Sequence, residues 1–583
     1  MKRNIIYAIA ALALSSCSFL DEHLTTSLTS TYGTESSLEA NMRGIQASLN
    51  FFLRDYPENL ESCSGLVHFG GTTNRVEDNR WKCILTNMTY TSMSLNIELY
   101  GNIYSAINRC NVLLDHLPDS PVEESFKNEI EGECKMYRAL LYLTAVRLYG
   151  DVPLSLTANE NNFSAKPRTP YYEVYDQIVE DLKDAFATMR DAAEVEERTP
   201  YQGRSNKWAA RALLSAAYLQ MASLLTVPQD DNFYDPSREG RTPVFGADGI
   251  GTDSAKAWEL CYETAKDVIE HGPYRLAEHY SDLFKWTEGY TDSRGRDCWN
   301  LDERIITVQS EAFTTGNYIA TRTLPTFPPD VVAEVNWATV SRSGNIRPSR
   351  FFFNEWCRRY ADDGTGNLVT GPRDSLYTAC LDPRLKVALI ETSYIPCNAT
   401  KATTIYPAAV QNNSMPYFRK YLTPTYQGKP DVADYYYMRL AEVYYIAAEA
   451  AMHTGHEDDA LDLVNEVHRR GGTPVWTAVS VDDIVWDKLL ELCCEGHSFY
   501  EVRRLGASWF KENILDARNA FFDTMGDQGE NYMQVFFGSS DFRYDFADDM
   551  NKVRAALLCE FPKEELTANS AMSLSDKNDF SRE

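Results

Sequence analysis

The sequence lacks the short motifs by which many enzymes bind nucleotides, metals or acyl groups. It contains no G-x-S-x-G, no G-x-x-x-x-G-K-[ST], no H-E-x-x-H and no G-x-G-x-x-G. Only nine of its 583 residues are histidines, and none of them pairs at a metal-ligand spacing. These absences argue against a nucleotide-binding enzyme, a zinc peptidase and a serine hydrolase of the usual kinds. We therefore expect no catalytic residues, no metal and no cofactor.

Basic residues are scarce relative to acidic ones. Lys and Arg number 56 and Asp and Glu number 84, so the net charge is −28. A chain this acidic repels phosphates, which argues against a nucleic-acid ligand. The same charge disfavours anionic polymers unless a local basic patch is present. Carboxylate pairs are too plentiful here to identify or exclude a glycosidase dyad.

No C-x-x-C occurs among the 13 cysteines, so their spacing gives no indication of a metal site. Cys493 and Cys494 are adjacent within a helical pattern and are predicted to be core residues. Cys63 and Cys83 are a possible disulfide if the chain is exported. The acidic stretch 362–367 is better interpreted as a plain turn than as a calcium loop, since its spacing does not fit an EF-hand.

Long apolar runs are also missing, apart from one near the N-terminus. Residues 5–14 are apolar and follow Lys2 and Arg3, a pattern typical of a secretory signal and too short for a membrane span. Leu14, Ser15, Ser16 and Cys17 then form a lipoprotein cleavage pattern; an ordinary signal peptide is the alternative. We expect residues 1–16 to be removed, Cys17 to be acylated, and 17–35 to be a lipidated tether to the membrane.

Helical periodicity dominates two blocks of the remaining domain, 36–583. In the first block, about 96–273, apolar stripes predict helices over 96–114, 126–149, 174–189, 207–224 and 257–269. In the second block, about 434–506, a stripe from Leu440 ends at Gly455, a second helix runs to Gly471, and a last helix is predicted over 481–505. Trp208, Trp258 and Trp486 fall on these stripes and are expected in the core.

Paired helices of this length, with alanines where two backbones approach, resemble tetratricopeptide repeats. A generic helical bundle is the simpler alternative. The fold class is therefore predicted as mostly α, a tetratricopeptide-like superhelix with an irregular, loop-rich ligand-binding half.

That irregular segment, about 274–433, is rich in Pro, Gly, Asn, Thr and aromatics, with a short β-like run over 305–308. Long loops in a compact domain are often functional.

Sugars bind by stacking on aromatic rings and by hydrogen bonds to Asn, Asp and Arg side chains. Two stretches offer this combination, one near 74–81 and one near 286–299. The candidate ligand-binding residues are Asn74, Arg75, Asn79, Arg80, Trp81, Trp286, Tyr290, Arg296 and Trp299, with Tyr318 and Trp337 as weaker additions. Loop-anchoring or core packing is the alternative for each tryptophan.

A series of motifs, in the same order, resembles the SusD/RagB-like outer-membrane lipoproteins. They are CSFLDE (17–22), YRA to YGDVP (137–153), the helix 207–219, DPR (382–384), RKY (419–421), RLAEVY (439–444) continued by 465–470, and 491–504. The resemblance implies a cell-surface glycan-binding lipoprotein of the outer membrane. It also implies delivery of oligosaccharides to a SusC-like TonB-dependent transporter. A binder of peptides or another nutrient, and a surface glycoside hydrolase, are the alternatives.

Overall fold

The structure is a computed structural model. It describes residues 31–53, 56, 60–61, 63–69, 94–158, 165–191, 204–233, 243–284, 302–310, 346–360, 380–390, 417–418, 420–421, 433–524 and 544–572. The predicted signal peptide and Cys17 lie outside these residues. Among the residues described, no helix is both long enough and apolar enough to cross a lipid bilayer.

The first block forms the predicted helices. They are α3 (Glu35–Ser48), α6 (Ser94–His116), α7 (Glu124–Tyr149), α8 (Tyr171–Thr188), α10 (Lys207–Thr226) and α11 (Ser254–His271). Side-chain caps from Thr34, Asn206 and Asp253 accept the first free N–H groups of α3, α10 and α11. Gly150 ends α7 with a positive φ of 71°, as its position in the sequence predicts.

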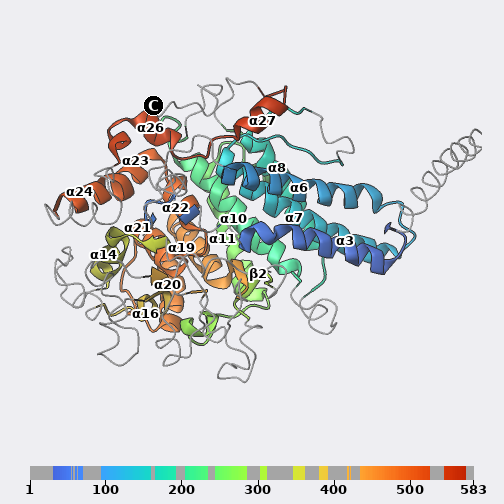
Figure 1. The fold of residues 1–583 in the computed structure, drawn as a ribbon. Helices are drawn as coiled ribbons and strands as arrows, with labels where there is room; N and C mark the ends of the chain where they lie inside the picture. The colour runs from blue at the N-terminus through green and yellow to red at the C-terminus, as the bar shows by residue number, and fades with distance from the viewer. Residues whose placement is uncertain are drawn as a thin grey trace, which may run out of the picture.

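Each of these helices packs against its neighbours in the sequence. α6 packs on α7, α7 on α8, α8 on α10 and α10 on α11, so that the helices follow one another across the molecule (Figure 1). Ala209, Ala212 and Leu213 on α10 are buried between these neighbours, which lets the backbones approach closely. The mostly α, tetratricopeptide-like architecture is confirmed.

The superhelix continues directly into the second block. α11 packs against α19 (Leu440–His453), and α19 packs against α20 (Glu457–Gly471), which ends at Gly472 in the left-handed conformation. α11 and α19 are therefore neighbours in space although 168 residues, 272–439, separate them in the sequence. Trp258 of α11 is buried, as is Trp486, whereas Trp208 is only partly buried against the core.

The predicted last helix, 481–505, is wrong. The chain forms α21 (Val481–Glu491) and α22 (Ser498–Arg504), separated by a turn in which Cys494 and Gly496 have φ values of 64° and 80°. Cys493 and Cys494 are buried, but Cys494 belongs to this turn and not to a helix. The turn directs the Glu495 carboxylate toward Arg439, 2.8 Å from its Nε. Long-range charge pairing therefore overrides the local helical pattern.

Three short antiparallel strand pairs accompany the helices. β1 (Val67–Phe69) pairs with β3 (Ile346–Pro348), β2 (Arg304–Val308) with β6 (Tyr435–Arg439), and β4 (Leu389–Ile390) with β5 (Tyr417–Phe418). β2 confirms the predicted β-like run. The remaining described elements are η1 (Leu49–Leu53), η4 (Ala247–Gly249), η5 (Tyr280–Phe284), α14 (Arg350–Arg359), α16 (Arg384–Ala388), α23 (Ala507–Phe510), η8 (Lys511–Asp516), α24 (Ala517–Thr524), η9 (Asp545–Asp548), α26 (Met550–Ala555) and α27 (Lys563–Ala568).

Candidate functional site

All predicted ligand-binding residues lie outside the described residues. They fall in three segments: Asn74, Arg75, Asn79, Arg80 and Trp81 in 70–93; Trp286, Tyr290, Arg296 and Trp299 in 285–301; and Tyr318 and Trp337 in 311–345. Their role remains a prediction. What the structure describes is where these segments join the fold.

Two of the three segments join the fold at neighbouring positions. Phe69, which precedes 70–93, lies opposite Ile346, which follows 311–345, in the β1–β3 pair. Directly opposed residues of antiparallel strands have Cα atoms about 4.5–5.5 Å apart. The start of segment 70–93 and the end of segment 311–345, which carry the candidates near 74–81 and 318–337, are therefore joined in one small sheet.

The third segment, 285–301, is attached to the same region through β6. It begins after Phe284, the last residue of η5, and the Tyr436 hydroxyl of β6 donates to the Leu283 carbonyl at 2.6 Å. It ends shortly before β2, whose last residue Val308 lies opposite Tyr435 of β6 and precedes 311–345. β2 thus links two of the predicted ligand-binding segments directly.

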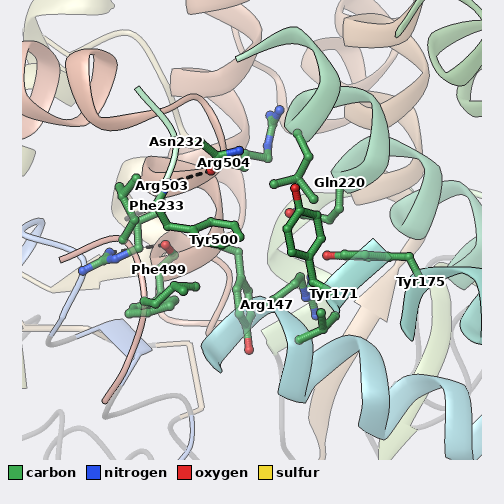
Figure 2. Close-up of a pocket in the computed structure, with 14 residues that line it drawn as sticks. Arg147, Tyr171, Tyr175, Gln220, Asn232, Phe233, Phe499, Tyr500, Arg503 and Arg504 are labelled. Carbon is green, nitrogen blue, oxygen red and sulfur yellow. Dashed lines mark hydrogen bonds between the residues drawn. The ribbon is translucent and has the colours of Figure 1, made fainter. Parts of the chain in front are cut away.

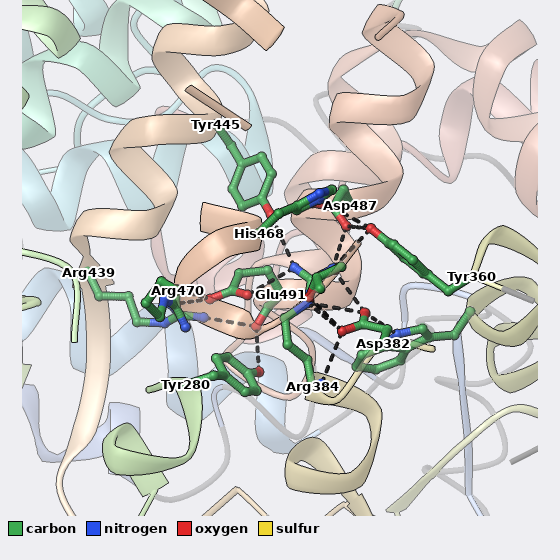
Figure 3. Close-up of polar contacts among 12 residues, drawn as sticks. Tyr280, Tyr360, Asp382, Arg384, Arg439, Tyr445, His468, Arg470, Asp487 and Glu491 are labelled. Carbon is green, nitrogen blue, oxygen red and sulfur yellow. Dashed lines mark hydrogen bonds and ion pairs between the residues drawn. The ribbon is translucent and has the colours of Figure 1, made fainter. Parts of the chain in front are cut away.

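A buried network of charged side chains includes Arg439 at the end of β6 (Figure 3). Its centre is Glu491 at the end of α21, which accepts from Arg439 Nη1 at 2.6 Å, Arg470 Nη2 at 2.6 Å and Arg384 Nη1 at 3.0 Å. Arg384 also donates from Nη2 to Asp487 at 2.6 Å and to Asp382 at 3.0 Å. One cluster therefore joins α16, α20, α21 and β6.

The network extends to the strands that carry the irregular half. Arg439 Nη1 donates to Glu303, just before β2, at 2.8 Å, and Lys420 Nζ, just after β5, donates to Glu495 at 2.7 Å. Glu303, Glu495 and Lys420 have no measurable exposure. The chain just after the predicted ligand segment 285–301 and the chain just after β5 are therefore both fixed to the helical frame by buried ion pairs.

Charge balance explains how so many ionised groups are tolerated inside the fold. Burial alone would raise the pKa of Glu491, but Arg470, Arg439 and Arg384 together hold it below 4.5. The pKa of Asp487 is lowered below its usual value in the same way, by Arg384 and His468 against the effect of burial. Buried charges that are paired and hydrogen-bonded in this way hold their partners in one arrangement.

A second buried network fixes α22. Arg504 Nη1 donates to Glu449 of α19 at 2.6 Å, and its Nε donates to Glu501 at 2.7 Å. Lys488 of α21 donates to the same Glu501 at 2.7 Å. Arg504 and Lys488 lower the pKa of Glu501 to about 2, although burial alone would raise it.

These networks are made of the motifs that carry the family resemblance. DPR supplies Asp382 and Arg384, RKY supplies Lys420, RLAEVY supplies Arg439, and the last motif supplies Glu491 and Glu495. Reasoning from single motifs did not assign them a role. The sequence feature that could have identified these buried charges is a charged residue inside an apolar run, such as Glu491 within LLELCCE.

The described residues also line a partly open cavity of about 50 Å³ between α7, α8, α10 and α22 (Figure 2). Arg147, Tyr175, Gln220 and Tyr500 line it, together with Leu558 from the chain after α26. Pockets for larger organic ligands usually measure about 300–1,000 Å³, so this cavity is too small for an oligosaccharide. No group of three His, Cys, Asp or Glu side chains in the described ranges is placed to hold a metal ion.

Two family models match separate parts of the chain. Residues 19–219 match the model described as "Starch-binding associating with outer membrane", and residues 395–578 match the SusD family model. Among curated proteins, SusD-like protein P25 of Formosa agariphila is 22% identical over 272 residues, 46% of this chain and 40% of that protein. SusD-like protein P2 of the same organism is 23% identical over 45% of this chain and 55% of its own. The chain thus spans about half the length of these relatives.

Solved structures share the fold over nearly the whole chain. A laminarin-binding SusD-like protein superposes with a TM-score of 0.61 at 18% identity, covering 92% of this chain and 98% of its own. A crystal structure with a xylogluco-oligosaccharide gives a TM-score of 0.63 at 16% identity over the same shares of the two chains. At these identities the likeness concerns the fold.

Proposed function

Because the chain belongs to the SusD/RagB-like family, we propose that it is a cell-surface lipoprotein that binds glycans and passes oligosaccharides to a SusC-like TonB-dependent transporter. Its place would be the outer membrane, held there by acyl groups on Cys17. Binding would involve no catalysis and no cofactor. Proteins of the same fold bind laminarin or have been crystallised with a xylogluco-oligosaccharide, which supports a carbohydrate ligand.

The observation that carries the proposal is the pairing of Phe69 with Ile346. It brings together the starting and ending points of two segments, one with Trp81 and one with Tyr318 and Trp337. A sugar needs several aromatic faces and polar groups in one place, and a shared sheet is a rigid support for them. The buried ion pair of Arg439 with Glu491 fixes β6, the partner strand of β2, to the superhelix.

The net charge of −28 favours a neutral glycan over an anionic one. Calorimetric titration of residues 18–583 against neutral β-glucan, xyloglucan and α-glucan oligosaccharides tests this directly. We expect saturable binding of at least one of them and no new reducing ends. Polygalacturonate serves as the anionic comparison and should bind more weakly. Absence of binding across the neutral panel, together with binding of peptides, would replace the glycan proposal by the peptide alternative.

Delivery to a transporter requires a physical partner. Affinity purification of the tagged full-length chain from outer membranes in mild detergent should recover a TonB-dependent barrel in stoichiometric amount. Recovery of the lipoprotein alone from membranes that contain such transporters would contradict this part of the proposal while leaving glycan binding intact.

A further inference from the structure

We infer that the cavity between α7, α8, α10 and α22 holds a small anion, of the class of chloride, formate or acetate, with Arg147 as its counter-charge. The described residues that line the cavity include none of the predicted ligand residues. The inference rests on the hydrogen-bond partners of three side chains that surround the cavity.

Arg147 has only neutral partners. Its Nε donates to the Leu143 carbonyl at 3.2 Å, its Nη2 donates to the Tyr437 hydroxyl at 3.1 Å, and its guanidinium carbon lies 3.9 Å from the centre of the Tyr500 ring. Within the described part of the chain, Arg147 forms no ion pair with a carboxylate. Its side chain is partly buried, and ring and hydroxyl contacts replace only part of the hydration of its guanidinium.

Another arginine that lines the same cavity, Arg504, is paired with carboxylates. Arg504 contacts the carboxylates of Glu449 and Glu501 at 2.6 and 2.7 Å. Arg138, which precedes Arg147 on α7, is paired with Asp181 at 2.8 Å. Arg147 differs from both, because it lines the cavity and forms no such ion pair among the described residues.

Two further polar groups reach the cavity without a partner. The Gln220 side chain is 7% exposed and the Tyr175 side chain 2% exposed, and in the ranges described neither the amide nor the hydroxyl forms a hydrogen bond. Figure 2 shows both among the side chains that surround the cavity, together with Arg147. Burial raises the pKa of Tyr175 above its usual value, so its hydroxyl keeps its proton and remains a donor. A cation, an amide and a hydroxyl facing one space are donors that suit an anion.

The size of the cavity limits the choice of anion. At about 50 Å³ it has room for roughly three to five water molecules, at about 10–15 Å³ each. Chloride, formate and acetate are of that size, whereas sugars and nucleotides are much larger. Because the walls come from α7, α8, α10 and α22, a bound anion would hold α22 and Leu558 to the first helical block.

Thermal unfolding at constant ionic strength tests the inference. In a buffer based on gluconate, which is too large for the cavity, stepwise exchange for chloride, formate or acetate should raise the Tm of residues 18–583 along a saturating curve. Arg147→Met should weaken the response at least tenfold. Arg469→Met is the matched control, because it removes the same charge from an exposed position, and its response should equal that of the unaltered protein.

Bromide-soaked crystals locate the anion. We expect an anomalous peak inside the cavity, near Arg147. Gln220→Leu, which leaves all charges in place, should reduce that peak and weaken the Tm response, and it decides the question if Arg147→Met does not fold. The inference is overturned if bromide is absent and only water fills the cavity, or if Gln220→Leu leaves both readouts unchanged.

Discussion

Arg439 donates from Nη1 to Glu491 Oε1 at 2.6 Å and thereby joins the end of β6 to the end of α21. Arg470 and Arg384 contact the same carboxylate, at 2.6 and 3.0 Å. One buried carboxylate therefore contacts three buried guanidinium groups, which also contact Asp382, Asp487, Glu303 and Glu495. Its loss would remove three hydrogen-bonded ion pairs at once in a region closed to water, which is far more costly than the loss of a surface pair.

We expect Glu491→Gln to lower the free energy of unfolding by about 3–5 kcal/mol, as removal of one partner from a buried ion pair commonly does. Urea unfolding followed by tryptophan fluorescence measures the change. Glu466→Gln is the control, since Glu466 forms an exposed pair with Arg469 at 2.6 Å and should change stability by less than about 1 kcal/mol. Equal, small effects for both variants would show that the network contributes nothing to stability.

Acid should destabilise the protein, because several buried carboxylates have lowered pKa values. Despite burial, Arg504 and Lys488 lower the pKa of Glu501 from 4.5 to about 2, and Glu491 and Asp487 are lowered in the same direction. Between pH 4.5 and 2 the unfolded chain therefore binds more protons than the folded chain at these sites. The free energy of unfolding must fall as pH falls through that window.

The Tm measured from pH 7 to pH 3 checks this expectation, with a decline beginning near pH 5. Burial raises the pKa values of Glu61 and Asp434, so these two groups act in the opposite sense and offset part of the decline. Glu501→Gln should flatten the decline between pH 5 and 3. A curve for Glu501→Gln that runs parallel to that of the unaltered protein would contradict the assignment.

The helices of the superhelix were predictable because their signal is local. The stripe over 126–149 gave α7 within two residues, and that over 207–224 gave α10 equally well, since each period is repeated several times within one element. The last helix, 481–505, could not be predicted in the same way. The break at Cys494 and Gly496 depends on Arg439 and Lys420, which reach Glu495 from distant parts of the chain.

The candidate site was predictable only in outline. Composition indicated an irregular segment with exposed aromatics, and β2 appears where the β-like run was expected. The pairing of Phe69 with Ile346 could not be inferred, because three-residue strands carry too little pattern to reveal a partner hundreds of residues away. The role of Arg384 and Asp382 was hidden for the same reason, since the DPR motif alone does not show what surrounds it.

Two glycine substitutions should have opposite effects on stability. Gly496 has a φ of 80° and its N–H donates to Glu61 Oε1 at 2.9 Å, so Gly496→Ala should lower the free energy of unfolding by about 1–2 kcal/mol. Gly101 is exposed within α6 and an added Cβ meets nothing within 4 Å, so Gly101→Ala should raise it by about 0.5–1 kcal/mol. Urea unfolding of both variants checks the signs. A neutral Gly496→Ala would mean that the turn relaxes without strain.

Cys17→Ala should move the protein from the membrane fraction to the soluble fraction of the cell envelope. Each buried methylene of an acyl chain contributes about 0.8 kcal/mol, so several chains on one cysteine hold the protein firmly. Immunoblots of separated fractions measure the change, with Ser18→Ala as the neighbouring control that keeps the acceptor thiol. Retention of Cys17→Ala in the membrane fraction would contradict the predicted anchor.

The predicted ligand-binding tryptophans should differ from core tryptophans in a measurable way. Trp258 is buried, its Nε1 donates to Thr226 at 2.9 Å, and its ring stacks on His453, so Trp258→Ala should lower the free energy of unfolding by about 3–5 kcal/mol. Where that variant is folded, its glycan affinity should be unchanged. Trp81→Ala and Trp286→Ala should show the reverse, with the Tm nearly constant and the affinity reduced about tenfold, equivalent to about 1.4 kcal/mol.

Calorimetric titration with the glycan that binds most tightly, beside thermal unfolding of all three variants, separates the two roles. A tryptophan that stacks on a sugar loses contact area only in the complex, so its removal changes the binding free energy and not the folding free energy. If Trp81→Ala and Trp286→Ala lower the Tm as much as Trp258→Ala and leave the affinity unchanged, both indoles belong to the core. The sugar would then have to lie on other residues of the irregular segment.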